Sequence, residues 1–205
     1  MKFQGMNVTQ RLILGFSVPV LMFAAFGVWL WTVMGDITEI ARQTKTESIV
    51  FAMYAKNMER NVVDVQQFLS DISATRAQDG LDDGFREAKR HYDDFNDDLS
   101  KFQKMFSAEG NGDGLKRTEQ IKERFDQFYT MGTKMAHAYV DGGPASGNKL
   151  MGEFDKVREE LQTALEPFVK SQLDEMKSNL GKAESMADQS RKNALMANVF
   201  ITGQC

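Results

Sequence analysis

The sequence predicts an all-α protein, in which a membrane anchor helix continues into an antiparallel four-helix bundle of up-down-up-down topology. Three observations predict this class. The stretch 12–34 contains no charged residue. Four long segments beyond it carry apolar residues at alternating steps of three and four, the spacing of a buried helix seam. Breaks rich in glycine separate these segments, and the chain holds only 3 prolines.

The stretch 12–34 is predicted to be a transmembrane helix. About 23 residues, at about 1.5 Å each, cover a hydrocarbon layer about 30 Å thick. Lys2 and Arg11 precede this stretch, so the positive-inside rule places the tail 1–11 in the cytoplasm. A signal peptide has a shorter apolar region, so we expect an uncleaved anchor. The alternative is a buried helix of a soluble protein.

The first helix is expected to continue without a break from the anchor to about Arg76. Its seam repeats in steps of four and three, which indicates coiled-coil-like packing. Asp-Gly pairs at 79–80 and 83–84 then predict its end. The seam consists of Ile37, Ala41, Thr44, Ser48, Phe51, Ala55, Met58, Val62, Val65, Leu69 and Ile72.

Two shorter helices are predicted over about 85–106 and 115–140. The break 109–114 resembles half of a calcium loop, but Gln120 stands where a bidentate glutamate is needed, so we expect a flexible turn. Gly132 lies on the second seam, where it predicts close approach of a neighbouring backbone. The seams are Phe85, Ala88, Tyr92, Phe95, Leu99, Phe102 and Phe106, and then Thr118, Ile121, Phe125, Phe128, Gly132, Met135 and Tyr139.

A loop is predicted over 141–148, followed by a last helix that runs towards the end of the chain. Its two seams are out of step around Pro167, so a stutter and a kink are expected there. Residues 194–205 turn apolar again and are expected to begin a truncated second membrane helix. The seams are Leu150, Phe154, Val157, Leu161 and Leu165, and then Leu173, Met176, Leu180, Ala183 and Ala187.

The first and last helices are predicted to be longer than the middle pair, with about 40 residues outside the bilayer against about 25. The segment 35–193 is therefore an extracytoplasmic domain that has four helices at its far end and two near the membrane. Since a lone helix pair buries little surface, we expect a homodimer.

Several classes of function are disfavoured by the composition. A net charge of −4 argues against nucleic acid as a partner. Cys205 is the single cysteine, so no internal disulfide forms. His91 and His137 lack ligand partners one helical turn away, so neither a metal nor another cofactor is expected. The chain shows no nucleophile-base arrangement and no phosphate-binding glycine loop, so we expect no enzymatic activity.

The candidate ligand-binding residues are Arg60, Asn61, Asp64 and Arg76. The first three form part of a polar stripe beside the seam of the first helix. Arginine offers paired donors to a carboxylate, so the hypothesis is a small anion, such as an organic acid or an amino acid. The alternative is that these residues are solvated flanks, and that Arg76 neutralises a helix C-terminus.

Two stretches carry a family resemblance: VVDVQQFLSDISATR at 62–76, and MAHAYVDGGP at 135–144 with GNKLM at 147–151. They resemble the periplasmic four-helix-bundle sensor region of bacterial methyl-accepting chemotaxis proteins. The resemblance implies a homodimeric receptor of the inner membrane, in which ligand binding displaces the last bundle helix. The linker domain, methylation helices and kinase-coupling tip of that family do not follow Cys205, so we expect a fragment or a truncated gene product.

Other classes remain open from the sequence. The segment is also compatible with the input domain of a sensor histidine kinase or cyclase, because such bundles are interchangeable modules. A ligand-free structural membrane coiled coil is a further alternative.

Overall fold

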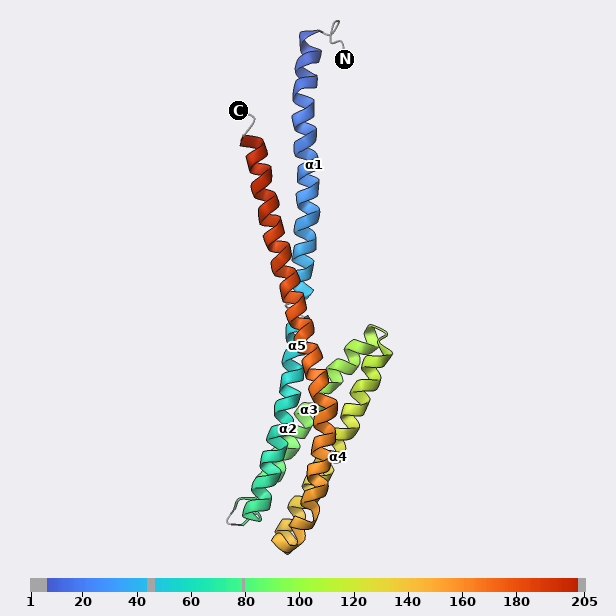
Figure 1. Ribbon diagram of the computed structural model, residues 1–205, viewed down its shortest axis with the longest axis vertical. Helices are drawn as coiled ribbons and strands as arrows, with labels where there is room; N and C mark the ends of the chain where they lie inside the picture. The colour runs from blue at the N-terminus through green and yellow to red at the C-terminus, as the bar shows by residue number, and fades with distance from the viewer. Residues whose placement is uncertain (1–6, 44–46, 79, 203–205) are drawn as a thin grey trace. The chain divides into compact units, whose positions relative to one another are not determined.

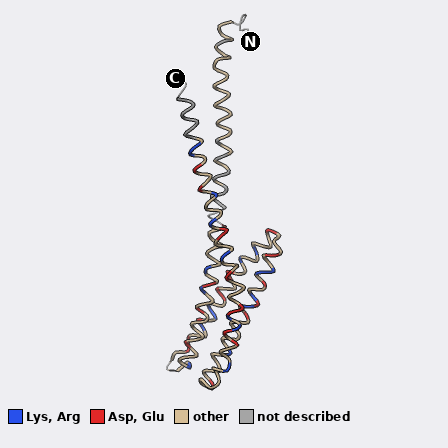
Figure 2. Tube along the Cα trace, viewed as in Figure 1, with Lys and Arg blue, Asp and Glu red and all other residues tan. Residues whose placement is uncertain are grey.

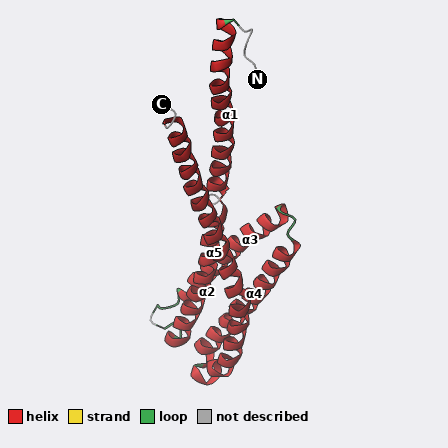
Figure 3. Ribbon diagram, turned by 45° about the horizontal axis from the view of Figure 1, so that its top comes forward, coloured by secondary structure: helices red, strands yellow, loops and turns green. Residues whose placement is uncertain are grey.

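The computed structural model describes residues 7–43, 47–78 and 80–202 of the chain. These residues form five helices joined by turns, without a strand among them (Figures 1 and 3). The all-α prediction is therefore confirmed: one apolar N-terminal helix is followed by four long packed helices. The helices are α1 (Val8–Gln43), α2 (Ile49–Thr75), α3 (Gly84–Ala108), α4 (Gly112–Gly142) and α5 (Pro144–Thr202).

The chain divides into two compact units. The first contains residues 1–45 and 178–205, and the second contains residues 46–177. Helix α1 belongs to the first unit, and α2, α3 and α4 belong to the second. Helix α5 contributes its beginning to the second unit and its end to the first.

Helix α1 is the apolar helix of the first unit. Its segment Val8–Trp29 has a mean hydropathy of 2.1, and none of that window is buried. Figure 2 shows this part of α1 without acidic side chains, whereas the helices of the second unit are densely charged. Among the described residues it is the one helix long and apolar enough to cross a membrane, which fits an anchor or a signal sequence.

Helix α1 starts where Asn7 and Gln10 cap it, because the Asn7 N–H donates to Gln10 Oε1 at 3.2 Å. The helix thus begins at Val8, ahead of the uncharged stretch 12–34. The predicted continuity between the anchor and the next helix depends on residues 44–46. Those residues, like Cys205, lie outside the described part of the chain.

The core of the second unit is largely aromatic. Phe95 of α3 stacks on Phe125 of α4 with ring centroids 3.7 Å apart, and Phe128 stacks on Phe154 of α5 at 5.2 Å. Each fully buried phenylalanine stabilises the fold by about 1.5–3 kcal/mol. All seven residues of the predicted α4 seam are buried, which confirms that seam: Thr118, Ile121, Phe125, Phe128, Gly132, Met135 and Tyr139.

Helix α2 covers this core with smaller side chains. The predicted seam is confirmed at Ala55, Met58, Val65, Leu69 and Ile72, all of which are buried. Asn61 is buried among them with 8% exposure. The buried surface of α2 therefore includes a polar position beside the candidate site.

The turn between α3 and α4 is shorter than predicted. It spans only residues 109–111, and Gly112 and Gly114 already belong to α4. The reason is an N-cap: the Asn111 side chain accepts from the Gly114 N–H at 2.9 Å. Asp113 adds a negative charge in the first turn, where the helix dipole favours it.

The predicted loop over 141–148 is wrong, because only Gly143 separates α4 from α5. Gly143 has φ 65° and ψ −164°, and its N–H bonds the Tyr139 carbonyl at 2.9 Å, which closes α4. Pro144 then opens α5 at the position where a missing N–H costs nothing. The glycine and proline are adjacent stop and start signals rather than parts of a loop.

Helix α5 runs through Pro167 as one helix. Of the second predicted seam, Leu173, Met176 and Ala183 are partly buried, whereas Leu180 and Ala187 are exposed. The buried row Phe154, Leu161 and Phe168 gives way after the proline to Val169, Met176 and Ala183, which is a change of phase by one residue. A second row keeps its seven-residue spacing across the proline and is largely polar: Leu165, Gln172, Asn179, Met186 and Asn193.

Gly132 lies at a close approach, as predicted, but side chains rather than a backbone approach it. A Cβ placed there lies 2.7 Å from Leu69 Cδ1 and 2.8 Å from Phe154 Cε2. Gly152 of α5 offers a matched comparison, because a Cβ there meets nothing within 4 Å.

We predict that Gly132→Ala destabilises the second unit by up to about 2 kcal/mol, since overpacking costs about 1–3 kcal/mol and alanine recovers about 1 kcal/mol of helix propensity. Gly152→Ala is expected to stabilise it by up to about 1 kcal/mol, because only the propensity changes. Urea unfolding of the full chain in detergent, followed by circular dichroism, measures both. Equal stability of the two variants would contradict the packing described here.

Candidate functional site

Three of the four predicted site residues lie together in an open groove between α2 and α3, here called the α2–α3 groove. Its volume is about 460 Å³. Helix α2 presents the adjacent residues Arg60 and Asn61 to it, and Asp64 one helical turn further on, while α3 supplies the opposite wall. The lining residues are Asn57, Arg60, Asn61, Asp64, Arg90, His91, Asp94, Asp97, Asp98 and Lys101.

On the α2 wall, the three predicted residues differ strongly in exposure. The Arg60 side chain is 81% exposed, and its Nε lies 3.6 Å from Asp64 Oδ2, whose side chain is 22% exposed. Asn61 is buried, and its Oδ1 lies 2.8 Å from His91 Nδ1 on α3. The α2 wall is thus tied to α3 through Asn61, and Arg60 remains free to reorient.

The α3 wall holds residues that the sequence analysis treated as a solvated acidic face. Lys101 Nζ donates to Asp98 Oδ1 at 2.8 Å and contacts Asp97 Oδ2 at 3.0 Å. The ammonium also lies 4.3 Å from the centroid of the Tyr54 ring of α2. The hydrogen bond with Asp98 raises the pKa of Lys101 above its ordinary value.

Each permanent cation of the α2–α3 groove is paired with a carboxylate of the protein itself. Four aspartates face three permanent cations, Arg60, Arg90 and Lys101, and each cation already pairs with a carboxylate. An incoming anion therefore has to displace a carboxylate from its cation. A ligand with one positive and one negative group costs less free energy to bind than a simple anion, because its positive group can pair with the displaced carboxylate.

Arg76 lies away from the α2–α3 groove. It caps α2 in the left-handed conformation, at φ 56° and ψ 29°. Its Nε donates to the Tyr139 carbonyl at 3.2 Å, and its guanidinium lies against Gly143. Because Tyr139 is in the last turn of α4, the charge of Arg76 sits where the helix dipole favours a cation.

A second groove separates α2 from α5 and has a volume of about 360 Å³. Its notable member is Arg158, whose Nε is buried and has no hydrogen-bond partner among the described residues. A buried unpaired donor costs about 1–3 kcal/mol. The lining residues are Glu59, Val62, Val63, Gln66, Arg158, Leu161, Gln162, Leu165 and Glu166.

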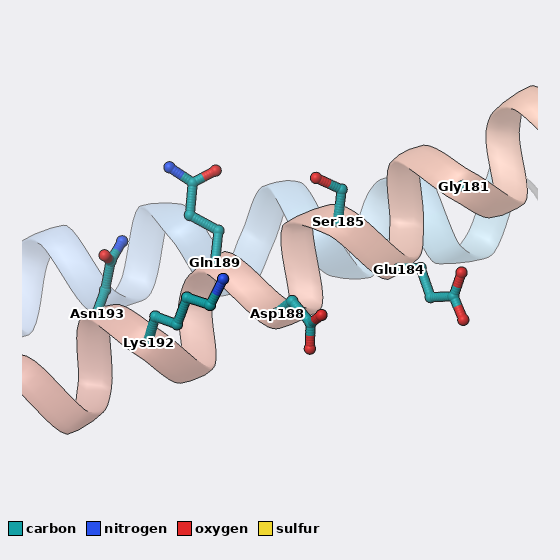
Figure 4. Close-up of a pocket in the computed structure, with 7 residues that line it drawn as sticks. All are labelled: Gly181, Glu184, Ser185, Asp188, Gln189, Lys192 and Asn193. Atoms are coloured by element: carbon teal, nitrogen blue, oxygen red, sulfur yellow. The ribbon is translucent and has the colours of Figure 1, made fainter.

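A third concavity, in the first unit, is lined from α5 alone (Figure 4). Its polar side chains follow the helix surface one turn after another, and Figure 4 shows them spreading in different directions. They do not converge on a common point, so this surface lacks the geometry of a site. The residues are Gly181, Glu184, Ser185, Asp188, Gln189, Lys192 and Asn193.

Within the described residues, no three side chains of the histidine, cysteine, aspartate or glutamate type come together as metal ligands. His91 faces the α2–α3 groove, whereas His137 is exposed on α4 and stacks on Phe85 with centroids 4.4 Å apart.

Comparison with known proteins identifies no family, because no family model, no curated protein and no solved structure matches the chain.

Tyr92 of α3, which lies outside the grooves, has a strongly raised pKa. Its hydroxyl donates to Asp126 Oδ1 of α4 at 2.8 Å. Burial, together with this bond, raises the pKa of Tyr92 from 10.0 to about 12. The folded state therefore holds the phenolic proton more tightly than the unfolded state does, so this stabilisation is complete below about pH 10 and is lost as the pH rises towards 12.

We predict that Tyr92→Phe removes the last step of a spectrophotometric phenolate titration of the full chain, the step near pH 12. Tyr54→Phe serves as the control, because Tyr54 donates to no carboxylate among the described residues, and this variant should keep the late step. Circular dichroism at each pH confirms that the helices persist. Loss of an early step in Tyr92→Phe would contradict the contact with Asp126.

Proposed function

We propose that the chain is the input part of a transmembrane receptor of the chemoreceptor kind. The observation that supports this most is the difference in composition between the two units, together with the helix that they share. One contains an apolar helix long enough to cross a membrane, the other is a charged bundle, and α5 extends from the bundle unit into the unit of α1. A continuous helix of this kind can pass a small displacement from a binding site to a membrane.

In this proposal α2, α3, α4 and the first half of α5 form an up-down-up-down bundle, as short connections between sequential helices favour. The bundle lies outside the cytoplasmic membrane, and α1 is the uncleaved anchor. Two copies associate, since the polar seam of α5 in the first unit buries little apolar surface. The output is a cytoplasmic chemotaxis module, or alternatively a histidine kinase or cyclase.

The proposed ligand is a small organic acid or an amino acid. Arg60, Asn61 and Asp64 form the first candidate centre, and Arg158 in the α2–α5 groove is a second. Arg76 is the weakest of the predicted residues, because its donor is already engaged by Tyr139. An amino acid fits the charges of the groove better than a simple anion does. Its carboxylate can bind an arginine, and its ammonium can pair with the aspartate that this arginine leaves.

We predict that at least one member of a panel of amino acids and short dicarboxylic acids raises the melting temperature of the full chain in detergent. Arg60→Gln should weaken its binding about tenfold, or about 1.4 kcal/mol. Arg117→Gln, on an exposed position of α4, is the control and should bind like the parent. Retained affinity in Arg60→Gln with loss in Arg158→Gln would move the site to the α2–α5 groove. A panel without any binder would favour the ligand-free coiled coil.

The membrane orientation provides a separate test. Lys2 and Arg11 precede the apolar helix, so the bundle is expected outside the cytoplasm. A phosphatase reporter, which folds only in an oxidising compartment, should be active when fused after Asn111. The same reporter fused ahead of Lys2 should be inactive. Activity in the reverse pattern would overturn the receptor proposal.

A further inference from the structure

His91 is held rigidly at the boundary between α2 and α3. Its side chain is only 12% exposed. The imidazole stacks on Phe68 of α2, with ring centroids 5.6 Å apart and an interplanar angle of 19°. Both ring nitrogens therefore have fixed neighbours, and the identity of those neighbours determines which nitrogen carries the proton.

The Nδ1 atom faces two acceptors on α2. It lies 2.8 Å from Asn61 Oδ1 and 3.4 Å from Asp64 Oδ2. A carboxylate oxygen cannot donate, so the proton of this contact belongs to Nδ1.

The Nε2 atom faces a donor on α3. Arg90 Nη2 lies 2.8 Å from it. A guanidinium has donors but no acceptor, so Nε2 must supply the lone pair. His91 is therefore a neutral imidazole in the Nδ1–H form, accepting from Arg90 and donating to Asn61.

The charged groups around this ring come from the two helices that form the groove. On α3, Arg90 is also held by Glu87 Oε2 at 3.0 Å and by Asp94 Oδ2 at 3.1 Å. On α2, Asp64 faces Nδ1, and Arg60 stands behind it. Arg90 thus keeps two carboxylate partners if it loses His91, and the imidazolium gains attraction to Asp64.

A second proton can bind only at Nε2, the atom that Arg90 occupies. Once it binds, two positive groups meet at that contact, and the bond between Arg90 and His91 must open. The proton comes from solvent, and no other bond changes. Protonation of a histidine is one of the local charge changes that switch proteins between states.

We propose that His91 is a proton-operated latch between α2 and α3, which holds Arg90 when it is neutral and releases Arg90 when it is protonated, while its existing contact with Asp64 becomes an ion pair. The role of this latch rests on the proposed receptor function, under which acidity outside the membrane is itself a stimulus. The latch would alter the α2–α3 groove without any ligand, because protonation adds one positive charge beside its aspartates and frees the Arg90 guanidinium from one partner.

The test uses the full chain in detergent, labelled with ¹⁵N in histidine and arginine. Its two histidines are a matched pair, since each stacks on a phenylalanine and only His91 faces an arginine. Long-range ¹H–¹⁵N correlation at pH 8 should show His91 as Nδ1–H with an unprotonated Nε2. Arg90→Met removes the donor at Nε2 and leaves the acceptors at Nδ1, so Nδ1–H should persist at pH 8 and Nε2 should take up its proton at a higher pH than in the parent, while the His137 signals stay unchanged.

A pH titration of the same sample then tests the release of Arg90 itself. The side-chain signal of Arg90 should shift over the pH range in which His91 becomes doubly protonated. This shift should be lost in His91→Gln and kept in His137→Gln. An Nε2–H signal from His91 in the parent at pH 8, or an Arg90 signal that ignores the protonation of His91, would overturn the latch. Neither outcome affects the ligand and topology tests of the receptor proposal.

Discussion

The stacked phenylalanines of α3, α4 and α5 are the packing on which the second unit depends. Phe95, Phe125, Phe128 and Phe154 form a continuous column of rings through three helices. Because aromatic side chains from these helices fill much of the interior, the apolar residues that α2 buries are aliphatic and none is aromatic. This leaves room on α2 for a buried polar residue, Asn61. The other three helices supply the aromatic packing of the core, so α2 can keep polar residues on the side that faces the α2–α3 groove.

The helices could be predicted from the sequence because the spacing of buried residues is a local property of each segment. The ends of the helices were harder to predict, because a glycine can be either a loop residue or a helix cap. At 109–114 a side-chain bond from Asn111 extends α4 backwards, and at 141–148 a single glycine followed by Pro144 replaces a loop. Composition shows that a break occurs, but the hydrogen bonds that set its length depend on the folded geometry.

The candidate site was predictable on one wall only. Arg60, Asn61 and Asp64 share a face of α2, which the helical period reveals. Their partners Arg90 and His91 come from another helix, and the rotation of α3 about its axis decides which of its charged residues face α2. Arg76 ends α2 and lies beside the end of α4, as helix lengths predict, but its bond to the Tyr139 carbonyl depends on the packing of the two helices. Contacts across helices require the packing, which no single segment encodes.

A receptor needs two states of similar free energy, and a stimulus that distinguishes them. The aromatic column is poorly suited to this, because close-packed rings shift only at high cost. The paired charges between α2 and α3 are better suited, since Arg90 and Asp64 each have alternative partners already in place. In the proposed latch, the bond lost between Arg90 and His91 is offset by the ion pair gained between His91 and Asp64, so the difference in free energy between the two states stays small. A proton adds no bulk to the groove, so this change leaves the packing of the aromatic column as it is.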